Sequence, residues 1–250
     1  MIERYKVSGT KSKRSCLSLM SELHFAYIIH SRSFTDSKIL IELLSSQLGR
    51  TKVVARKPTK KNRSQFQTFQ LLEVALKGTS ELKTLIYCEA PPIKSARPKL
   101  QGTSLFCAMY INEILQRLLP LEEPDQMLFD AYEQALVNLA TATDVSGREV
   151  ALRVFELNLL SVLGYAIDFG VTSAGEPIAV DKYYTFKADI GFIEQGLRFD
   201  ESSISGSILR SIEQSEFVPV ESLVSAKRIT RAALLPLLGQ RPLKSRELFK

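Results

Sequence analysis

The feature that most constrains the fold is a change in hydrophobic period at a proline-rich segment. Between residues 25 and 88 the apolar residues form short runs rich in β-branched and aromatic side chains, whereas after residue 104 they recur every three or four positions. The first pattern is typical of strands and the second of amphipathic helices. Residues 91–103, with three prolines and a glycine, separate the two regions, and we interpret them as a linker.

The region before the linker predicts a small β-barrel. Its strand-like runs cover residues 25–30, 38–48, 51–55, 70–77 and 82–88. Residues 78–81 (Gly-Thr-Ser-Glu) join the last two runs and indicate a β-hairpin. Five short strands without long helices between them favour a closed barrel. The run 38–48 remains ambiguous, because a short apolar run also fits a helix.

The region after the linker predicts a mostly helical domain. Helices are expected over residues 104–119, 126–140, 149–163, 204–215 and 220–235, with Ser104 as the N-cap of the first. Residues 165–203 carry strand-like patches among turn residues and indicate an irregular insertion. We therefore expect an α+β chain with a disordered extension (1–20), a barrel domain (21–95) and a helical domain (96–250).

Charge is distributed very unevenly along the chain. The net charge of +6 divides into +12 for residues 1–100, −12 for residues 101–222 and +6 for residues 223–250. No Asp or Glu occurs from residue 43 to residue 72. A surface of like charges repels itself, and an anionic polymer compensates it, although a solvated loop is the simpler alternative. This basic loop holds Arg50, Lys52, Arg56, Lys57, Lys60, Lys61 and Arg63.

Aromatic side chains beside the basic loop strengthen a nucleic-acid interpretation, because single strands are bound by phosphate neutralisation together with base stacking. Phe34 and Phe66 are candidates for stacking, with a core position as the alternative for Phe66 and for Phe69. We add Arg32 and Lys38 to the predicted DNA-binding residues. A second anion-binding surface is predicted at the C-terminal end, from Lys227, Arg228, Arg231, Lys244 and Arg246.

Several classes of protein are disfavoured. The chain has no 18-residue apolar run, no G-x-S-x-G or G-x-G-x-x-G motif, and no carboxylate cluster with a catalytic spacing. Three widely spaced cysteines and two histidines make no familiar zinc site, and the cysteines indicate reduced thiols in a cytosolic protein. We expect no enzyme activity, no metal and no cofactor.

Arg153 stands out in the acidic part of the chain, on a helix crowded with apolar side chains. It could form a helix salt bridge with Glu149 or Glu156. Alternatively, with Arg148 nearby, it could hold the carboxylate of a partner peptide.

The chain resembles the RecO family of bacterial recombination mediators over about residues 24–250. The resemblance rests on A-Y-I-I-H-S-R at 26–32, G-R-T-K-V-V-A-R at 49–56, G-T-S-E-L-K-T-L at 78–85, Y-I-N-E-I-L-Q-R-L-L-P at 110–120, L-R-V-F-E-L-N-L-L-S-V-L-G-Y at 152–165 and P-L-K-S-R-E-L-F at 242–249. Many family members also carry four zinc-binding cysteines between the positions of Gly164 and Ser203, where this chain has none.

The resemblance implies an N-terminal OB-fold and a mostly helical second domain. It implies a cytoplasmic, nucleoid-associated protein that binds single- and double-stranded DNA and anneals complementary strands without ATP. It also implies RecR and the acidic, Phe-ending tail of single-stranded DNA-binding protein as partners in loading RecA. We place that tail at Arg153 and Arg148. Two alternatives remain: a protein-interaction scaffold with incidental DNA binding, and a nuclease.

Overall fold

The chain divides into two compact units. The computed structural model describes residues 22–59, 66–91, 98–197, 200, 202–218 and 220–249. The barrel unit comprises Met1–Arg97 with Pro120–Asp125, and the helical unit comprises Pro98–Leu119 with Gln126–Lys250. Residues 120–125, expected as a loop of the helical domain, therefore belong with the barrel.

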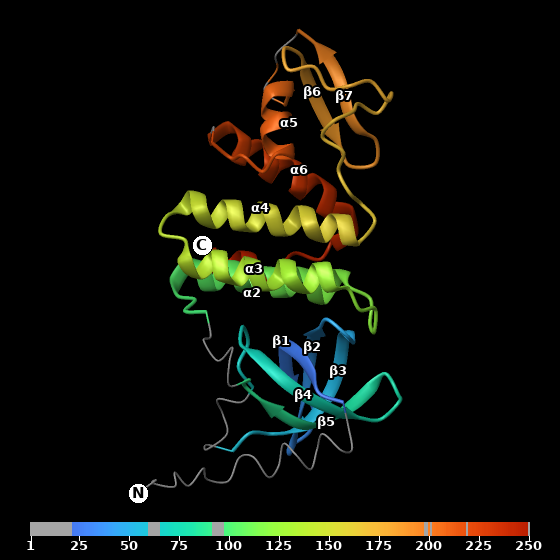
Figure 1. The fold of residues 1–250 in the computed structure, drawn as a ribbon, viewed down its shortest axis with the longest axis vertical. Helices are drawn as coiled ribbons and strands as arrows, with labels where there is room; N and C mark the ends of the chain where they lie inside the picture. Colours follow the sequence, from blue (N-terminus) through green and yellow to red (C-terminus); the bar gives the residue numbers. More distant parts are fainter. Residues whose placement is uncertain are drawn as a thin grey trace, which may run out of the picture. The chain divides into compact units, whose positions relative to one another are not determined.

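The barrel unit is a closed barrel of five strands, as expected (Figure 1). The strands close in the order β1-β2-β3-β5-β4, and every neighbouring pair is antiparallel except β3 with β5. This closure leaves no unpaired sheet edge. The strands are β1 (His24–Ser33), β2 (Lys38–Ser45), β3 (Gly49–Arg56), β4 (Leu71–Lys77) and β5 (Leu82–Glu89).

Alternating apolar residues fill the inside of the barrel. In β2, Ile41 and Leu43 lie in the same buried cluster as Ala26 and Ile28 of β1 and Val53 of β3. Pairing with β1 and β3 identifies residues 38–45 as a strand and resolves the ambiguous run. Because side chains alternate along a strand, Lys38 and Leu40 point to the outside of the barrel.

The helical unit contains α2 (Gly102–Leu118), α3 (Gln126–Thr141), α4 (Val145–Val162), α5 (Gly206–Glu213), α6 (Val220–Leu238) and the short 3₁₀ helix η2 (Lys244–Phe249). The expected N-cap of the first helix was wrong. Ser104 is buried inside α2, and Gln101 is the N-cap without a side-chain hydrogen bond. Helix α4 starts four residues earlier than expected, because the Asp144 side chain accepts a hydrogen bond of 2.8 Å from the Gly147 N–H.

The insertion folds as a three-stranded sheet in the order β7-β6-β8, formed by β6 (Tyr183–Lys187), β7 (Gly191–Gly196) and β8 (Ile204–Ser205). The helix expected from residue 204 begins at Gly206 instead, because Ile204 and Ser205 pair with β6. Tyr184 and Phe192 of the sheet share a buried apolar cluster with residues of α5 and α6. That packing holds the insertion, in which residues 165–203 include no cysteine.

Two other kinds of site are absent from the described residues. No group of three or more His, Cys, Asp or Glu side chains among them could hold a metal ion. None of the helices in the described ranges is long and apolar enough to cross a membrane.

Candidate nucleic-acid interface

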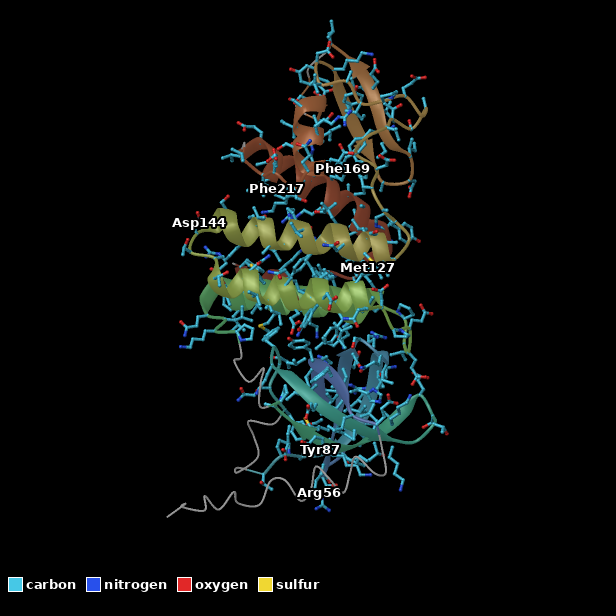
Figure 2. The ribbon with its side chains drawn as sticks, viewed as in Figure 1. Arg56, Tyr87, Met127, Asp144, Phe169 and Phe217 are labelled. Atoms are coloured by element: carbon cyan, nitrogen blue, oxygen red, sulfur yellow. The ribbon has the colours of Figure 1, made fainter. Side chains whose placement is uncertain are left out.

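Five of the predicted DNA-binding residues meet at one end of the barrel, where β1 turns into β2 and β3 ends. Lys38 of β2 pairs directly with Arg56 of β3, and Arg32 of β1 pairs with Leu40, two residues along from Lys38. Because alternate residues share a face, Arg32, Lys38 and Arg56 all project from the outer surface. Figure 2 shows Arg56 at this end of the barrel. We call Arg32, Phe34, Lys38, Arg56 and Lys57 the hairpin-end cluster.

Backbone hydrogen bonds fix the hairpin-end cluster. The N–H groups of Phe34 and Thr35 donate to the Lys38 carbonyl at 3.0 and 3.1 Å, which closes the turn. The Lys57 N–H donates to the Ser37 carbonyl at 2.8 Å and ties the end of β3 to that turn. The Phe34 side chain is 47% exposed at the turn. The cluster therefore presents an exposed aromatic ring among cations on a rigid frame.

The cross-strand pair of Lys38 and Arg56 is electrostatically unfavourable in the free protein. Like charges directly opposite each other in a sheet repel and destabilise it. Both side chains are exposed, and no ion pair is found for either of them, or for Arg32 and Lys57, among the described residues. A bound anion would relieve this repulsion.

Arg50 and Lys52, nearer the start of β3, differ from the hairpin-end cluster because both form ion pairs. The Arg50 Nη1 lies 3.4 Å from the Glu42 Oε2, with both side chains largely buried. The Lys52 Nζ lies 3.2 Å from the Glu81 Oε1. Glu42 lies in β2 and Glu81 in the turn before β5. Because both lie outside the basic loop, its local sequence did not predict these ion pairs. Both residues are held in ion pairs here, which differs from the expectation of free cations.

The two phenylalanines after the basic loop are placed by the barrel core. Phe69 is 2% exposed, with a φ of 63°. Phe66 is half-buried and packs against the barrel cluster, so its core alternative describes it better than a stacking position. Lys60, Lys61 and Arg63 lie outside the described residues.

The C-terminal cations lie on two elements of the helical unit. Arg228 and Arg231 are exposed on one face of α6, whereas the Lys227 Nζ lies 2.6 Å from the Glu149 Oε1 of α4. Lys244 and Arg246 are exposed on η2. Lys227 thus joins two helices, and the other four cations remain at the surface.

Glu113 and Arg117 of α2 fix the segment that carries Lys244 and Arg246. The two nitrogens Nη1 and Nη2 of Arg117 each donate to a backbone carbonyl at 2.6 Å, those of Arg241 and Pro242. The Glu113 carboxylate accepts from the N–H groups of Lys244 and Ser245 and from the Ser245 hydroxyl, at 2.7 to 2.9 Å. We call Glu113 and Arg117 the tail clamp. The i,i+4 spacing was visible in the sequence, but its distant partner was not.

Arg153 lies in a buried polar network between α2, α4 and α6. Its Nη2 donates to the Glu156 Oε1 at 2.8 Å, and its Nη1 lies 3.6 Å from the Glu149 Oε2. The hydroxyls of Tyr110 and Thr230 also donate to the Glu156 carboxylate. Burial first, and then the negative charge of Glu156, raise the pKa of the Tyr110 hydroxyl. The salt bridge considered for Arg153 is therefore present.

The guanidinium of Arg153 is nevertheless incompletely paired. Its side chain is 4% exposed, and its Nε and Nη1 have no hydrogen-bond acceptor among the described residues. Burying donors of a charged group without acceptors costs free energy. A ligand that supplies an acceptor to such atoms would therefore bind favourably. Arg148, five residues earlier on α4, is half-buried.

A closed five-stranded barrel with a basic outer end, joined to packed helices with a small sheet, defines a two-part protein of the OB-barrel and helical-domain class. The family models agree with this division. The model described as Recombination protein O N terminal matches residues 20–91, and that described as Recombination protein O C terminal matches residues 100–247. The chain belongs to the RecO family of DNA repair proteins.

Individual relatives match over nearly their whole length. The DNA repair protein RecO of Pseudoalteromonas translucida is 34% identical over 232 residues, which are 92% of this chain and 97% of the relative. That of Hamiltonella defensa is 39% identical over 91% of this chain and 96% of the relative. That of Pectobacterium atrosepticum is 41% identical over 90% of this chain and 91% of the relative.

Proposed function

We propose that this chain is a non-enzymatic mediator of recombinational DNA repair at the bacterial nucleoid. In this proposal it anneals complementary single strands and, together with RecR, helps to load RecA on DNA coated by single-stranded DNA-binding protein. The observation that carries DNA binding is the pair of like charges formed by Lys38 and Arg56, flanked by Arg32 and the exposed Phe34. Family membership supports the repair role.

The mechanism requires no bond-making chemistry. Cations of the hairpin-end cluster bind the phosphates of a strand, and Phe34 offers a face on which a base can stack. Neutralised strands repel each other less, so complementary bases meet more often. The backbone hydrogen bonds that fix the turn keep these groups in place before DNA arrives, which lowers the entropic cost of binding.

Lys38→Gln combined with Arg56→Gln tests the interface. Each lost phosphate contact should reduce the salt slope of single-strand binding by about 0.7, so the double variant should lose roughly 1.4 in slope and about tenfold or more in affinity at low salt. Fluorescence anisotropy with a labelled oligonucleotide, titrated at several salt concentrations, measures both. An annealing assay with complementary strands should slow in parallel.

Lys77→Gln is the matched control, because Lys77 is an exposed lysine of β4 outside the hairpin-end cluster. It removes the same kind of charge from the same barrel and should change the affinity by less than about twofold. Equal losses per charge removed in Lys77→Gln and in the double variant would assign DNA binding to net charge alone and would contradict the proposed interface.

A second contact of the proposal concerns the acidic, Phe-ending tail of single-stranded DNA-binding protein. The Nε and Nη1 of the buried Arg153 have no hydrogen-bond acceptor among the described residues and favour a carboxylate ligand, which a peptide of this kind carries at its terminus. Arg148 would add charge at the edge of this site.

The test compares tail-peptide binding by Arg153→Lys and Arg148→Gln with that of the unchanged chain. Arg153→Lys keeps the charge but removes the planar fork, so binding should weaken by about tenfold; the melting temperature, measured alongside, separates this effect from the weakened pairing with Glu149 and Glu156. Binding that survives Arg153→Lys unchanged would leave Arg153 as a purely structural ion-pair partner. If the unchanged protein bound the tail peptide but not DNA, the alternative function, a protein-interaction scaffold, would be favoured.

A further inference from the structure

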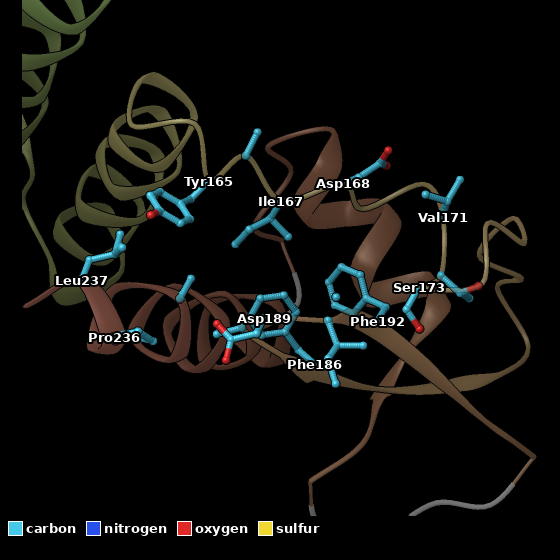
Figure 3. Close-up of a pocket in the computed structure, with 16 residues that line it drawn as sticks. Tyr165, Ile167, Asp168, Val171, Ser173, Phe186, Asp189, Phe192, Pro236 and Leu237 are labelled. Atoms are coloured by element: carbon cyan, nitrogen blue, oxygen red, sulfur yellow. The ribbon is translucent and has the colours of Figure 1, made fainter. Parts of the chain in front are cut away.

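A pocket in the helical unit is lined by residues that belong to none of the sites described above. It has a volume of about 390 Å³ and is formed by the segment after α4, the β6–β7 hairpin and the end of α6 (Figure 3). This volume is at the small end of the range for ligand sites and suits one long side chain with its backbone.

Aromatic and apolar groups form much of the pocket. The rings of Phe186 and Phe192 both line it, with centroids 5.1 Å apart. Figure 3 shows Tyr165 and Ile167, from the segment after α4, lining the pocket together with these rings. Tyr165 is 56% exposed and Ile190, at the hairpin turn, is 54% exposed. The pocket therefore combines one buried ring, Phe192, and one half-buried ring, Phe186, with an exposed apolar rim.

The charge of the pocket is opposite to that of the whole chain. Asp168 and Asp189 line it with exposed carboxylates, and none of the 16 lining residues is Lys, Arg or His. The Asp168 Oδ1 accepts from the Gly170 N–H at 2.8 Å, and no ion pair is found for either aspartate among the described residues. A chain with a net charge of +6 thus keeps this pocket free of cations.

Helix α6 adds negative potential to the same place. Its last turn, with Pro236 and Leu237, lines the pocket, and the C-terminal end of a helix carries partial negative charge. Pro236 has no N–H, so the carbonyl of Ala232, four residues earlier, receives no helical hydrogen bond from it. Carboxylates, a helix C-terminus and aromatic faces all favour a cation on an apolar stem.

We infer that this pocket docks an arginine side chain from a peptide segment of a partner protein. A guanidinium stacks on aromatic faces and pairs with carboxylates through a planar fork, which matches the phenylalanine rings beside two aspartates. The exposed apolar rim at Tyr165 and Ile190 would contact side chains next to the arginine, which a free cation would not have. This docking site is separate from the proposed DNA interface and adds a positively charged partner to the proposed function.

The probe is the capped tripeptide Leu-Arg-Leu, titrated into the full ¹⁵N-labelled chain, with Leu-citrulline-Leu as the neutral counterpart of the same shape. We expect roughly millimolar binding of the arginine peptide. Saturable amide shifts should be confined to residues 165–173, 186–192 and 233–237. The citrulline peptide should bind at least about tenfold more weakly, because it lacks the charge.

Asp168→Asn combined with Asp189→Asn should weaken the arginine peptide by at least about tenfold, and the asparagine at position 168 can still accept from the Gly170 N–H. Asp181→Asn is the matched control, since Asp181 is exposed but does not line the pocket. DNA affinity should stay within about twofold in the double variant, so failure here is distinguishable from failure of the DNA interface.

Three results would overturn the inference. The first is equal binding of the two peptides, and the second is undiminished binding by the double aspartate variant. The third is tighter binding of spermidine than of the arginine peptide at the same amides, which would assign the pocket to a polyamine.

Discussion

At the scale of single residues, the partner across the sheet decides what a charged side chain can do. Lys38 and Arg56 face each other and remain exposed, whereas Arg50, six residues earlier on the same strand as Arg56, is buried against Glu42. All are basic residues of one region, and only their neighbours distinguish them. The sequence predicted the basic surface. Which of its cations remain exposed depends on the residues that pair with them across the sheet.

Gly49 shows how closely one residue is constrained. Its φ is 65°, and a Cβ there would lie 2.3 Å from the backbone oxygen of Glu123. Gly49→Ala should therefore lower the unfolding free energy of the barrel by about 3 kcal/mol or more, through left-handed strain together with a steric clash. Native-state hydrogen exchange of the amides in β1 to β5 measures this unfolding free energy for the barrel alone.

Gly78→Ala separates the two contributions. Gly78 also has a positive φ, of 111°, but a Cβ there would meet only the Lys83 Cα at 4.0 Å. It should cost about 1 kcal/mol, from backbone strain without a clash. If Gly49→Ala cost no more than Gly78→Ala, the close approach of Glu123 would not be a constraint on the barrel.

At the scale of elements, the tail clamp positions η2. The Glu113 carboxylate accepts three hydrogen bonds from the first residues of η2, and the Phe106 ring of α2 lies edge-on to Phe249 with centroids 6.0 Å apart. Helix α2 thus holds both ends of a short basic element that has too few residues to be stable alone.

Glu113→Gln should loosen η2. A side-chain amide offers one acceptor oxygen and turns its NH₂ group toward donors, so either the Lys244 N–H or the Ser245 N–H loses its acceptor. Trypsin should then cleave after Lys244 and Arg246 at least about tenfold faster than in the unchanged chain, as measured by mass spectrometry. Glu216→Gln, a change at an exposed acid of the same unit, should leave the cleavage rate unchanged.

The same clamp should respond to acid. Burial tends to raise the pKa of Glu113, but the hydrogen bonds from Ser245 and Lys244 and the charge of Arg117 together hold it below its ordinary value of 4.5. A lowered pKa in the folded state stabilises the clamp at pH values above 4.5, and this contribution is lost as the pH falls through the lowered pKa. The amide NMR signals of Lys244 and Ser245, followed against pH, should shift only below pH 4.5, and a shift beginning near pH 6 would contradict this assignment.

At the scale of the whole molecule, two separate segments of the chain contribute to the barrel unit. The Glu122 N–H donates to the Arg50 carbonyl at 2.9 Å, and Lys83 forms an ion pair with the Glu122 carboxylate. These contacts bring residues 120–125 to the barrel, although helices of the other unit precede and follow them. The two units are therefore not two consecutive pieces of sequence.

Replacing residues 120–125 with a Gly-Ser linker of equal length should lower the unfolding free energy of the barrel by about 1 to 3 kcal/mol, because backbone and ion-pair partners of β3 and β5 are lost. Hydrogen exchange of the β3 amides should report the loss. Glu123→Ser keeps the backbone of this segment and serves as the control. A barrel of unchanged stability in the linker variant would show that residues 120–125 rest on the barrel without supporting it.

The elements of the fold were largely predictable, and the site only in part. Strands and helices follow from local hydrophobic period, so all five barrel strands were expected, including the one that the period alone left ambiguous. The starts of α2 and α4 were missed because capping depends on one side-chain hydrogen bond, present at Asp144 and absent at Gln101. A single contact of this kind leaves a weak trace in the sequence.

The sequence by itself determined the order of the two regions, the basic and acidic division and the family, since each is written in composition, period or motif along the chain. Only the tertiary structure decided which cations remain exposed, that Glu113 holds the segment before Phe249, and that two aspartates border an aromatic pocket. Those facts depend on residues far apart in the chain that meet in space. Charge and hydrogen bonding act over a few ångströms of distance, whatever the separation in sequence.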